Sequence, residues 1–177
     1  YSGSHVSFAE LEGMQERTVI LNGLSKSHAM TGWRVGYVLG DPSLVGAMTK
    51  VHQYTMLSAP TMAQVAALEA IQKGEEEMQQ MMHEYDLRRR MFVSGLNRIG
   101  LDCFEPKGAF YAFPSVKAWG LSSEEFAERL LKEQKVAVVP GSVFGPSGEG
   151  LLRCSYATSR EELIEALDRI EKFLANL

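Results

Sequence analysis

The sequence has little cysteine and no long apolar run. Cys103 and Cys154 are the only cysteines among 177 residues, which is too few for a disulfide scaffold and lacks the paired spacing of a zinc site. We therefore expect two buried free thiols in a reducing compartment, with the cytoplasm as the location. No apolar run reaches the length of a membrane-spanning helix, and the first residues lack the basic and apolar regions of a secretion signal. Neither export nor membrane insertion is expected.

An excess of basic charge is also missing. The chain has 18 Lys and Arg against 22 Asp and Glu, which gives a formal net charge of −4. Its longest basic run is Arg88–Arg90. This balance argues against a nucleic-acid or membrane-surface partner and favours a small molecule. Because 45% of the residues are hydrophobic, a chain of this length can bury a core, and disorder is excluded.

Several local motifs of reactive sites are absent as well. The sequence has no Gly-x-x-x-x-Gly-Lys-Ser/Thr phosphate loop, no Ser-x-x-Lys and no Gly-x-Ser-x-Gly. The histidines, at positions 5, 28, 52 and 83, are too far apart for a local metal motif. No metal site is therefore expected, and His28 is expected to be a hydrogen-bonded loop histidine rather than a proton shuttle.

Short apolar runs and helical spacing predict an α/β fold class. Apolar, partly β-branched runs predict buried strands at residues 18–22 and 35–40, with a polar loop at 23–34 between them. Apolar residues at helical spacing then predict a helix over residues 60–72. A second helix is expected from Glu75 onward and should continue for about seven turns.

The pattern after the long helix predicts a compact α+β unit. Two of its helices are expected to begin at capping boxes, Ser122 with Glu125 and Ser159 with Glu162. Three strands are expected, at residues 109–114, 136–139 and 151–156.

The expected loop at residues 23–34 gathers reactive groups. Lys26 follows a strand, and a lysine there can act as a nucleophile when burial lowers its pKa. The alternative is an ordinary surface lysine. Arg34 comes 34 − 26 = 8 residues later, where a guanidinium can bind a phosphate or carboxylate with two hydrogen bonds. A structural salt bridge is the alternative for Arg34.

A further arginine lies inside the expected strand at 151–156. The two-residue period of a strand places Leu152, Cys154 and Tyr156 on one face and Arg153 on the other. A buried arginine at such a position requires an anionic partner. That partner is either a neighbouring Asp or Glu or a bound substrate, and the sequence leaves both open.

The segment Asn22–Tyr37, NGLSKSHAMTGWRVGY, resembles the cofactor-lysine segment of class I pyridoxal-phosphate-dependent aminotransferases. The resemblance covers essentially the whole chain, and its general character is similar to bacterial aspartate, aromatic or N-acetyl-diaminopimelate aminotransferases. Four further segments resemble the family in the same order: Ser58–Thr61, Gly108–Tyr111, Val136–Gly141 and Arg153–Ala157.

The resemblance implies roles for four residues. Lys26 resembles the catalytic lysine that forms an aldimine with pyridoxal 5′-phosphate and later moves the Cα proton. Arg34 resembles the arginine that binds the cofactor phosphate, and Ser25 a helper at the same phosphate. Arg153 resembles the arginine that binds the substrate α-carboxylate. The implied enzyme transfers an amino group between an amino acid and a 2-oxo acid.

The resemblance also implies a division of the chain. Residues 1–58 resemble the C-terminal end of the large cofactor-binding domain, residues 59–99 the bridging helices, and residues 100–177 the small α+β domain of fold type I. The family's Asp for the pyridine nitrogen and its phosphate loop have no counterpart in the sequence. We therefore expect the C-terminal part of a longer, homodimeric enzyme, and we expect this chain alone to be inactive.

Two other functions share the lysine motif and the fold. One is a pyridoxal-phosphate-dependent carbon–sulfur lyase, which differs in what leaves after Cα deprotonation. The other is the non-enzymatic, aminotransferase-like effector domain of certain bacterial transcription regulators. Both stay open at the level of sequence.

Overall fold

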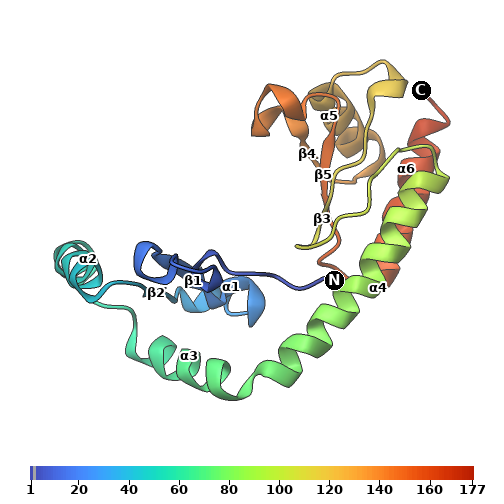
Figure 1. Ribbon diagram of the computed structural model, residues 1–177. Helices are drawn as coiled ribbons and strands as arrows, with labels where there is room; N and C mark the ends of the chain where they lie inside the picture. The colour runs from blue at the N-terminus through green and yellow to red at the C-terminus, as the bar shows by residue number, and fades with distance from the viewer. Residues whose placement is uncertain (2) are drawn as a thin grey trace. The chain divides into compact units, whose positions relative to one another are not determined.

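The computed structural model describes residue 1 and residues 3–177, which divide into two compact units. The N-terminal unit is Gly3–Met81, and the C-terminal unit combines Tyr1 with Met82–Leu177. The long helix α4 (Glu75–Arg98) passes through the division (Figure 1). Its length confirms the expected helix of about seven turns.

The N-terminal unit is built around an antiparallel pair of short strands. The pair confirms the two expected strands, with ends shifted by one or two residues. The prediction of a plain loop between them is wrong, because this segment contains a helical turn and a 3₁₀ turn. The elements in order are η1 (Phe8–Glu10), η2 (Gln15–Arg17), β1 (Ile20–Gly23), α1 (Leu24–Ser27), η3 (Thr31–Trp33), β2 (Gly36–Leu39), α2 (Pro42–Thr55), α3 (Thr61–Lys73) and the start of α4.

Helix α2 was not expected from the sequence, although its start carries a local signal. The Asp41 carboxylate accepts hydrogen bonds from the backbone N–H of Ser43, at 2.8 Å, and of Leu44, at 3.4 Å. Pro42 occupies the first helical position, where its fixed φ fits and its missing N–H costs nothing. The Asp-Pro pair therefore begins a helix as well as ending a strand.

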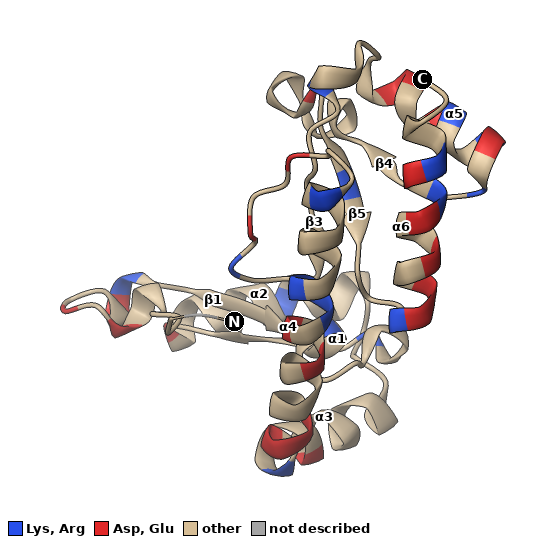
Figure 2. Cartoon of the chain, turned by 90° about the vertical axis from the view of Figure 1, so that its right-hand side faces the viewer, with Lys and Arg blue, Asp and Glu red and all other residues tan. Residues whose placement is uncertain are grey.

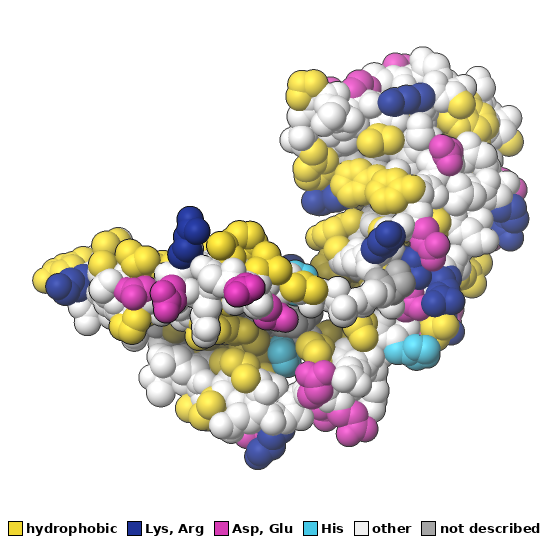
Figure 3. All heavy atoms as spheres, viewed as in Figure 1, with side chains coloured by type: hydrophobic (Ala, Val, Ile, Leu, Met, Phe, Trp, Pro, Cys, Tyr) yellow, Lys and Arg dark blue, Asp and Glu magenta, His cyan; other side chains and the backbone are white. Residues whose placement is uncertain are grey.

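Helix α3 confirms the expected helix, but its larger apolar side chains are exposed. Ala63 and Ala67 are the buried residues of α3, and Ala67 packs with Leu24 and Met30 in the small core of the N-terminal unit. Figure 3 shows apolar side chains on the surface of the molecule. The exposed apolar side chains of α3 are those of Met62, Val65, Leu68 and Ile71.

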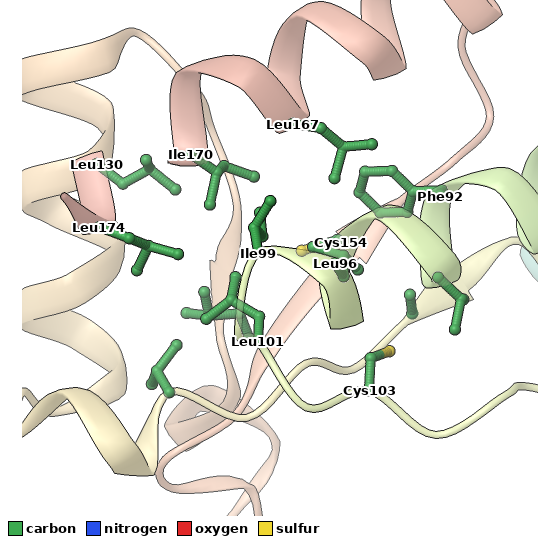
Figure 4. Packing of buried hydrophobic residues seen from close by; sticks show 14 of the residues in the cluster. Phe92, Leu96, Ile99, Leu101, Cys103, Leu130, Cys154, Leu167, Ile170 and Leu174 are labelled. Atoms are coloured by element: carbon green, nitrogen blue, oxygen red, sulfur yellow. The ribbon is translucent and has the colours of Figure 1, made fainter. Parts of the chain in front are cut away.

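The C-terminal unit packs helices against a three-stranded antiparallel sheet of order β3-β5-β4. Figure 4 shows side chains from α4, α5, α6 and β5 meeting in its core, among them Phe92, Leu130, Cys154 and Leu167. The remaining elements are β3 (Tyr111–Ala112), η4 (Lys117–Trp119), α5 (Ser123–Gln134), β4 (Val139–Pro140), η5 (Gly141–Phe144), η6 (Pro146–Gly148), β5 (Leu152–Ser155) and α6 (Arg160–Leu174).

The expected helix starts of this unit are confirmed. The Oγ atoms of Ser122 and Ser159 each accept a hydrogen bond, at 3.2 Å, from the backbone N–H three residues later. The expected strand at 136–139 is largely wrong, because only Val139 and Pro140 pair with β5. The expected strand at 109–114 is reduced to Tyr111–Ala112.

Charged residues occur all along α4 and α6 (Figure 2). Glu84 of α4 accepts hydrogen bonds from Arg160, at the start of α6, and from Arg88. These bonds, that from Arg160 first, lower the pKa of Glu84 to about 2. An ionised Glu84 therefore ties α6 to α4 throughout the ordinary pH range.

Both cysteines are buried free thiols, which confirms the expectation from the sequence. Burial raises the pKa of Cys103 to about 11 and that of Cys154 to about 12. The thiolate, the reactive form, is therefore scarce at neutral pH. Among residue 1 and residues 3–177, no helix is both long and apolar enough to cross a membrane.

A close crossing of backbone shapes the connection from β4 to β5. A Cβ added at Gly148 would overlap the carbonyl oxygen of Gly141, whereas one added at Gly108 would meet nothing within 4 Å. We expect Gly148→Ala to lower the free energy of unfolding by about 2 kcal/mol and Gly108→Ala to change it by less than about 0.5 kcal/mol. Denaturant unfolding of the complete protein measures both, and equal stabilities would contradict this crossing.

Candidate active site

Lys26 is held at the surface by a short helix that is anchored on the inside. Helix α1 begins directly after β1, and its first residue, Leu24, is only 3% exposed. Leu24 packs with the buried Met30, and its carbonyl accepts the backbone N–H of both His28 and Met30. Lys26, two residues after this anchor, is exposed, so the burial named above for a reactive lysine is not observed in this unit. The buried leucine thereby fixes the direction in which the lysine leaves the unit.

Two hydrogen bonds connect Arg34 to the backbone beside Lys26. The Thr31 hydroxyl donates to the carbonyl of Ser25 at 2.8 Å. Nη1 of Arg34 donates to the carbonyl of Thr31 at 3.0 Å. The segment that the sequence analysis singled out is therefore closed on itself, and Ser25, Lys26 and Arg34 belong to one hydrogen-bonded loop.

The backbone of Arg34 is left-handed, with φ 54° and ψ 45°. Residues other than glycine seldom adopt this conformation, which costs on the order of 1 kcal/mol and occurs often at functional sites. At Arg34 it ends the 3₁₀ turn η3 and directs the chain into β2. The position of this arginine is thus set by a backbone conformation that the loop must maintain.

The strand pair fixes both ends of the same loop. Asn22 pairs with Tyr37 and Gly23 with Gly36, and the Asn22 amide donates to the Tyr37 hydroxyl at 3.1 Å. A Cβ at Gly36 would lie 2.7 Å from the Asn22 carbonyl oxygen. Glycine at position 36 therefore allows the strands to approach closely where the loop leaves and re-enters the pair.

His28 lies two residues after Lys26 and was weighed above as a proton shuttle. Nδ1 of His28 lies 2.9 Å from the Ser27 hydroxyl, which confirms the expected hydrogen-bonded histidine. His28 also borders a mostly apolar cavity of about 220 Å³. Within the described part of the chain, no group of three or more His, Cys, Asp or Glu residues could hold a metal ion.

Arg153 lies in the middle of β5, within the C-terminal unit. Leu152, Cys154 and Tyr156 are at most 4% exposed, whereas Arg153 is half-buried. The alternation expected from the sequence is therefore confirmed. Because the alternate side chains fill the core, the arginine is held on the opposite face of the sheet.

Aromatic rings, rather than acids, contact Arg153. Its Cζ lies 4.7 Å from the ring centroid of Tyr111 and 4.7 Å from that of Phe144. No carboxylate among the described residues forms an ion pair with Arg153 or with Arg34.

Arg89 shows what a structural arginine of this chain looks like. It is 4% exposed and pairs with Asp86 at 2.6 Å and with Glu105 at 2.5 Å. Its guanidinium also donates to the carbonyl of Pro106 at 3.1 Å. The sequence left an internal acid and a bound substrate as possible partners of Arg153. Among the described residues, no acid pairs with Arg153 as Asp86 and Glu105 pair with Arg89.

Neither Tyr111 nor Phe144 is among the site residues predicted from the sequence. Tyr111 pairs with Ser155 across the β3–β5 ladder, so the strand period puts it on the face of Arg153. That pairing register was the missing information for Tyr111. Phe144 comes from η5, a 3₁₀ turn that carries no sequence signal for this face.

Comparison with known proteins defines the class. The sequence model of the family "Aminotransferase class I and II" matches residues 1–170, and the chain belongs to this family. The structure is similar to that of an aromatic aminotransferase from Pyrococcus horikoshii OT3, with a TM-score of 0.94 at 45% identity, over 99% of this chain and 48% of that one. The expected fold type I of pyridoxal-phosphate-dependent transferases is confirmed.

Individual relatives agree with this class. The Bacillus subtilis (strain 168) protein YugH, whose name assigns it provisionally to the aminotransferases, is 58% identical over 98% of this chain and 45% of its own length. An aspartate aminotransferase of Pyrococcus abyssi is 48% identical over 96% of this chain and 44% of its own length. The chain thus spans less than half the length of the relatives that it matches.

The hydroxyl of Thr31 provides a direct test of the closed loop. We expect Thr31→Val to speed amide exchange in peptides covering residues 24–35 by about fivefold, because one hydrogen bond of about 1 kcal/mol is lost. Thr31→Ser keeps the hydroxyl and is the matched control. Mass spectrometry measures the exchange rates. Equal rates in the two variants would contradict the role of this bond.

Proposed function

We propose that this chain supplies the cofactor lysine and the substrate-carboxylate arginine of a pyridoxal-phosphate-dependent aminotransferase. The enzyme would transfer an amino group between an amino acid and a 2-oxo acid. Family membership supports the reaction class, and the names of the relatives are those of aminotransferases. The observation that carries the assignment of residues is the hydrogen-bonded loop that joins Ser25, Lys26 and Arg34.

The groups on this loop suit the chemistry of pyridoxal 5′-phosphate. A lysine amine reacts with an aldehyde, and Lys26 is exposed at the end of its short helix. A guanidinium and a hydroxyl suit a phosphate dianion, and Arg34 and Ser25, whose backbone segments are linked through Thr31, would provide these groups. When bound, the cofactor supplies an electron sink for the negative charge that develops at the substrate Cα.

Lys26 has two tasks in this proposal. Its amine holds the cofactor before substrate arrives, and after release it moves the proton at the substrate Cα. Only the neutral amine can accept that proton, and a positioned base contributes about 10²- to 10⁴-fold to such a step. The anchored Leu24 and the closed loop limit the directions that the amine can take.

Arg153 binds and orients the substrate in this proposal. The guanidinium fork donates two parallel hydrogen bonds to the α-carboxylate, and this grip decides which bond at Cα faces the base. Orientation of this kind lowers the barrier by several kcal/mol in well-positioned reactions. No internal acid among the described residues competes for the fork.

The domain assignment stays part of the proposal. Residues 1–58 would complete the large cofactor-binding domain, residues 59–99 would bridge the domains, and residues 100–177 would form the small domain. We infer a homodimer and small-molecule substrates from the family. The cysteine content supports the cytoplasm as the location.

Lys26 can be tested by chemical trapping in the complete enzyme. Borohydride reduction fixes the cofactor to the lysine that holds it, and we expect the labelled peptide to contain Lys26. Lys26→Ala should lower turnover by at least about a thousandfold, whereas Lys50→Ala, at an exposed position on α2, should leave it nearly unchanged. A label on Lys50 would contradict the assignment.

The role of Arg153 can be tested by comparing the effects of a substitution on kcat/KM for amino acids and on cofactor affinity. In Arg153→Lys the fork becomes a point charge, so we expect kcat/KM for amino acids to fall about a hundredfold while cofactor affinity changes little. Arg98→Lys, at an exposed position of the same unit, is the control. If Arg153→Lys lost cofactor instead and kept its efficiency when saturated with it, the carboxylate role would be wrong.

A further inference from the structure

Arg153 is held by two aromatic side chains from different elements. Tyr111 comes from β3 and Phe144 from η5, and the guanidinium lies over both rings at 4.7 Å from each centroid. We propose that this ring pair, Tyr111 and Phe144, positions the guanidinium of Arg153 to receive the substrate carboxylate. The inference rests on the proposed function and adds two positioning residues to it.

Aromatic rings can hold a guanidinium without occupying its hydrogen-bond donors. A ring attracts the cation through its π face, whereas a carboxylate partner takes N–H donors in pairs. Arg89 illustrates the second case, because Asp86, Glu105 and the carbonyl of Pro106 all accept from it. Its Cζ also lies 4.9 Å from the ring centroid of Tyr1, so the two arginines differ in their acceptors and not in the presence of a ring. At Arg153 the ring pair leaves the fork available to an incoming carboxylate.

Each ring of the pair has a further contact within the C-terminal unit. Tyr111 is fixed by its place in the β3–β5 ladder. The ring of Phe144 meets the ring of Phe113 edge to face at 6.0 Å. Two independent supports make the ring pair a preformed part of the fold.

The turn that carries Phe144 is pinned to helix α5. The fully buried Ser123 accepts a hydrogen bond from the backbone N–H of Ser142 at 3.4 Å. The N–H and hydroxyl of Ser123 both donate to the Glu149 carboxylate at 2.9 Å. Glu149 is thereby engaged at the start of α5, and its pKa is lowered by these hydrogen bonds.

A guanidinium held in one orientation binds a carboxylate with less loss of side-chain freedom. Arg has many rotamers, and a free arginine must give them up when the substrate arrives. If the ring pair has already restricted Arg153, binding is favoured by pre-organisation. Loss of a ring should therefore weaken substrate binding more than it slows the chemical step.

The test compares ring removal with ring retention in the complete holoenzyme. We expect Phe144→Leu and Tyr111→Leu each to raise KM for both the amino acid and the 2-oxo acid about three- to fivefold. The kcat should change less than twofold, and the dissociation constant of pyridoxal phosphate should be unchanged. Phe144→Tyr and Tyr111→Phe should recover most of the affinity, and Phe104→Leu, at a ring that is 66% exposed, is the matched control.

A second measurement separates action through Arg153 from a general structural effect. In an Arg153→Gln background no cation remains for the rings to hold, so Phe144→Leu should lower kcat/KM by less than twofold further. An undiminished further loss would overturn the proposal, as would unchanged KM values in both leucine variants. If Phe144→Leu fails to fold, Tyr111→Leu carries the same test.

The outcome also distinguishes this inference from the function on which it rests. If Arg153→Gln leaves KM unchanged, the carboxylate role of Arg153 itself is wrong. If Arg153→Gln raises KM strongly while the leucine variants do not, the carboxylate role stands and only the ring pair is refuted.

Discussion

The alternation of side chains along β5 is the constraint on which the substrate side of the proposal depends. Leu152 and Cys154 must enter the core between the sheet and the helices, so Arg153 has to project from the opposite face. That face supplies the rings of Tyr111 and Phe144, and no acid of the described chain pairs with the arginine. Packing on one side of a strand thereby leaves a cation ready to bind an anion on the other.

Buried apolar residues also flank Lys26 in the sequence. Leu24 and Met30 bury their side chains, whereas Lys26 and Arg34 are exposed. The loop is closed by Thr31, and its end is fixed by the left-handed backbone of Arg34. In both units, apolar residues within a few positions hold a cation that we propose to be functional, so buried and proposed reactive side chains are neighbours in one segment.

Local signals were sufficient for part of this structure. The caps at Ser122 and Ser159 and the alternation around Arg153 follow from spacing alone, and both were confirmed. Lys26 and Arg34 were candidates from their place in the loop, but only the resemblance to a family favoured a cofactor role over a surface lysine and a structural salt bridge. Strand pairing could not be predicted from the sequence, and the strand expected at 136–139 pairs only at its end. The contact between Phe144 and Arg153 could not be predicted either, because it depends on a turn whose path is held by Ser123 and Glu149. Such contacts join distant positions, so no local pattern encodes them.

We propose that one chain supplies a lysine for the cofactor aldehyde and two arginines for two different anionic groups. A crystal structure of the complete enzyme with pyridoxal phosphate and a carboxylate inhibitor that lacks an amino group is the decisive test. We expect the cofactor joined to Lys26, its phosphate against Arg34, and the inhibitor carboxylate on the fork of Arg153. Attachment to another lysine, or a carboxylate bound away from Arg153, would contradict it.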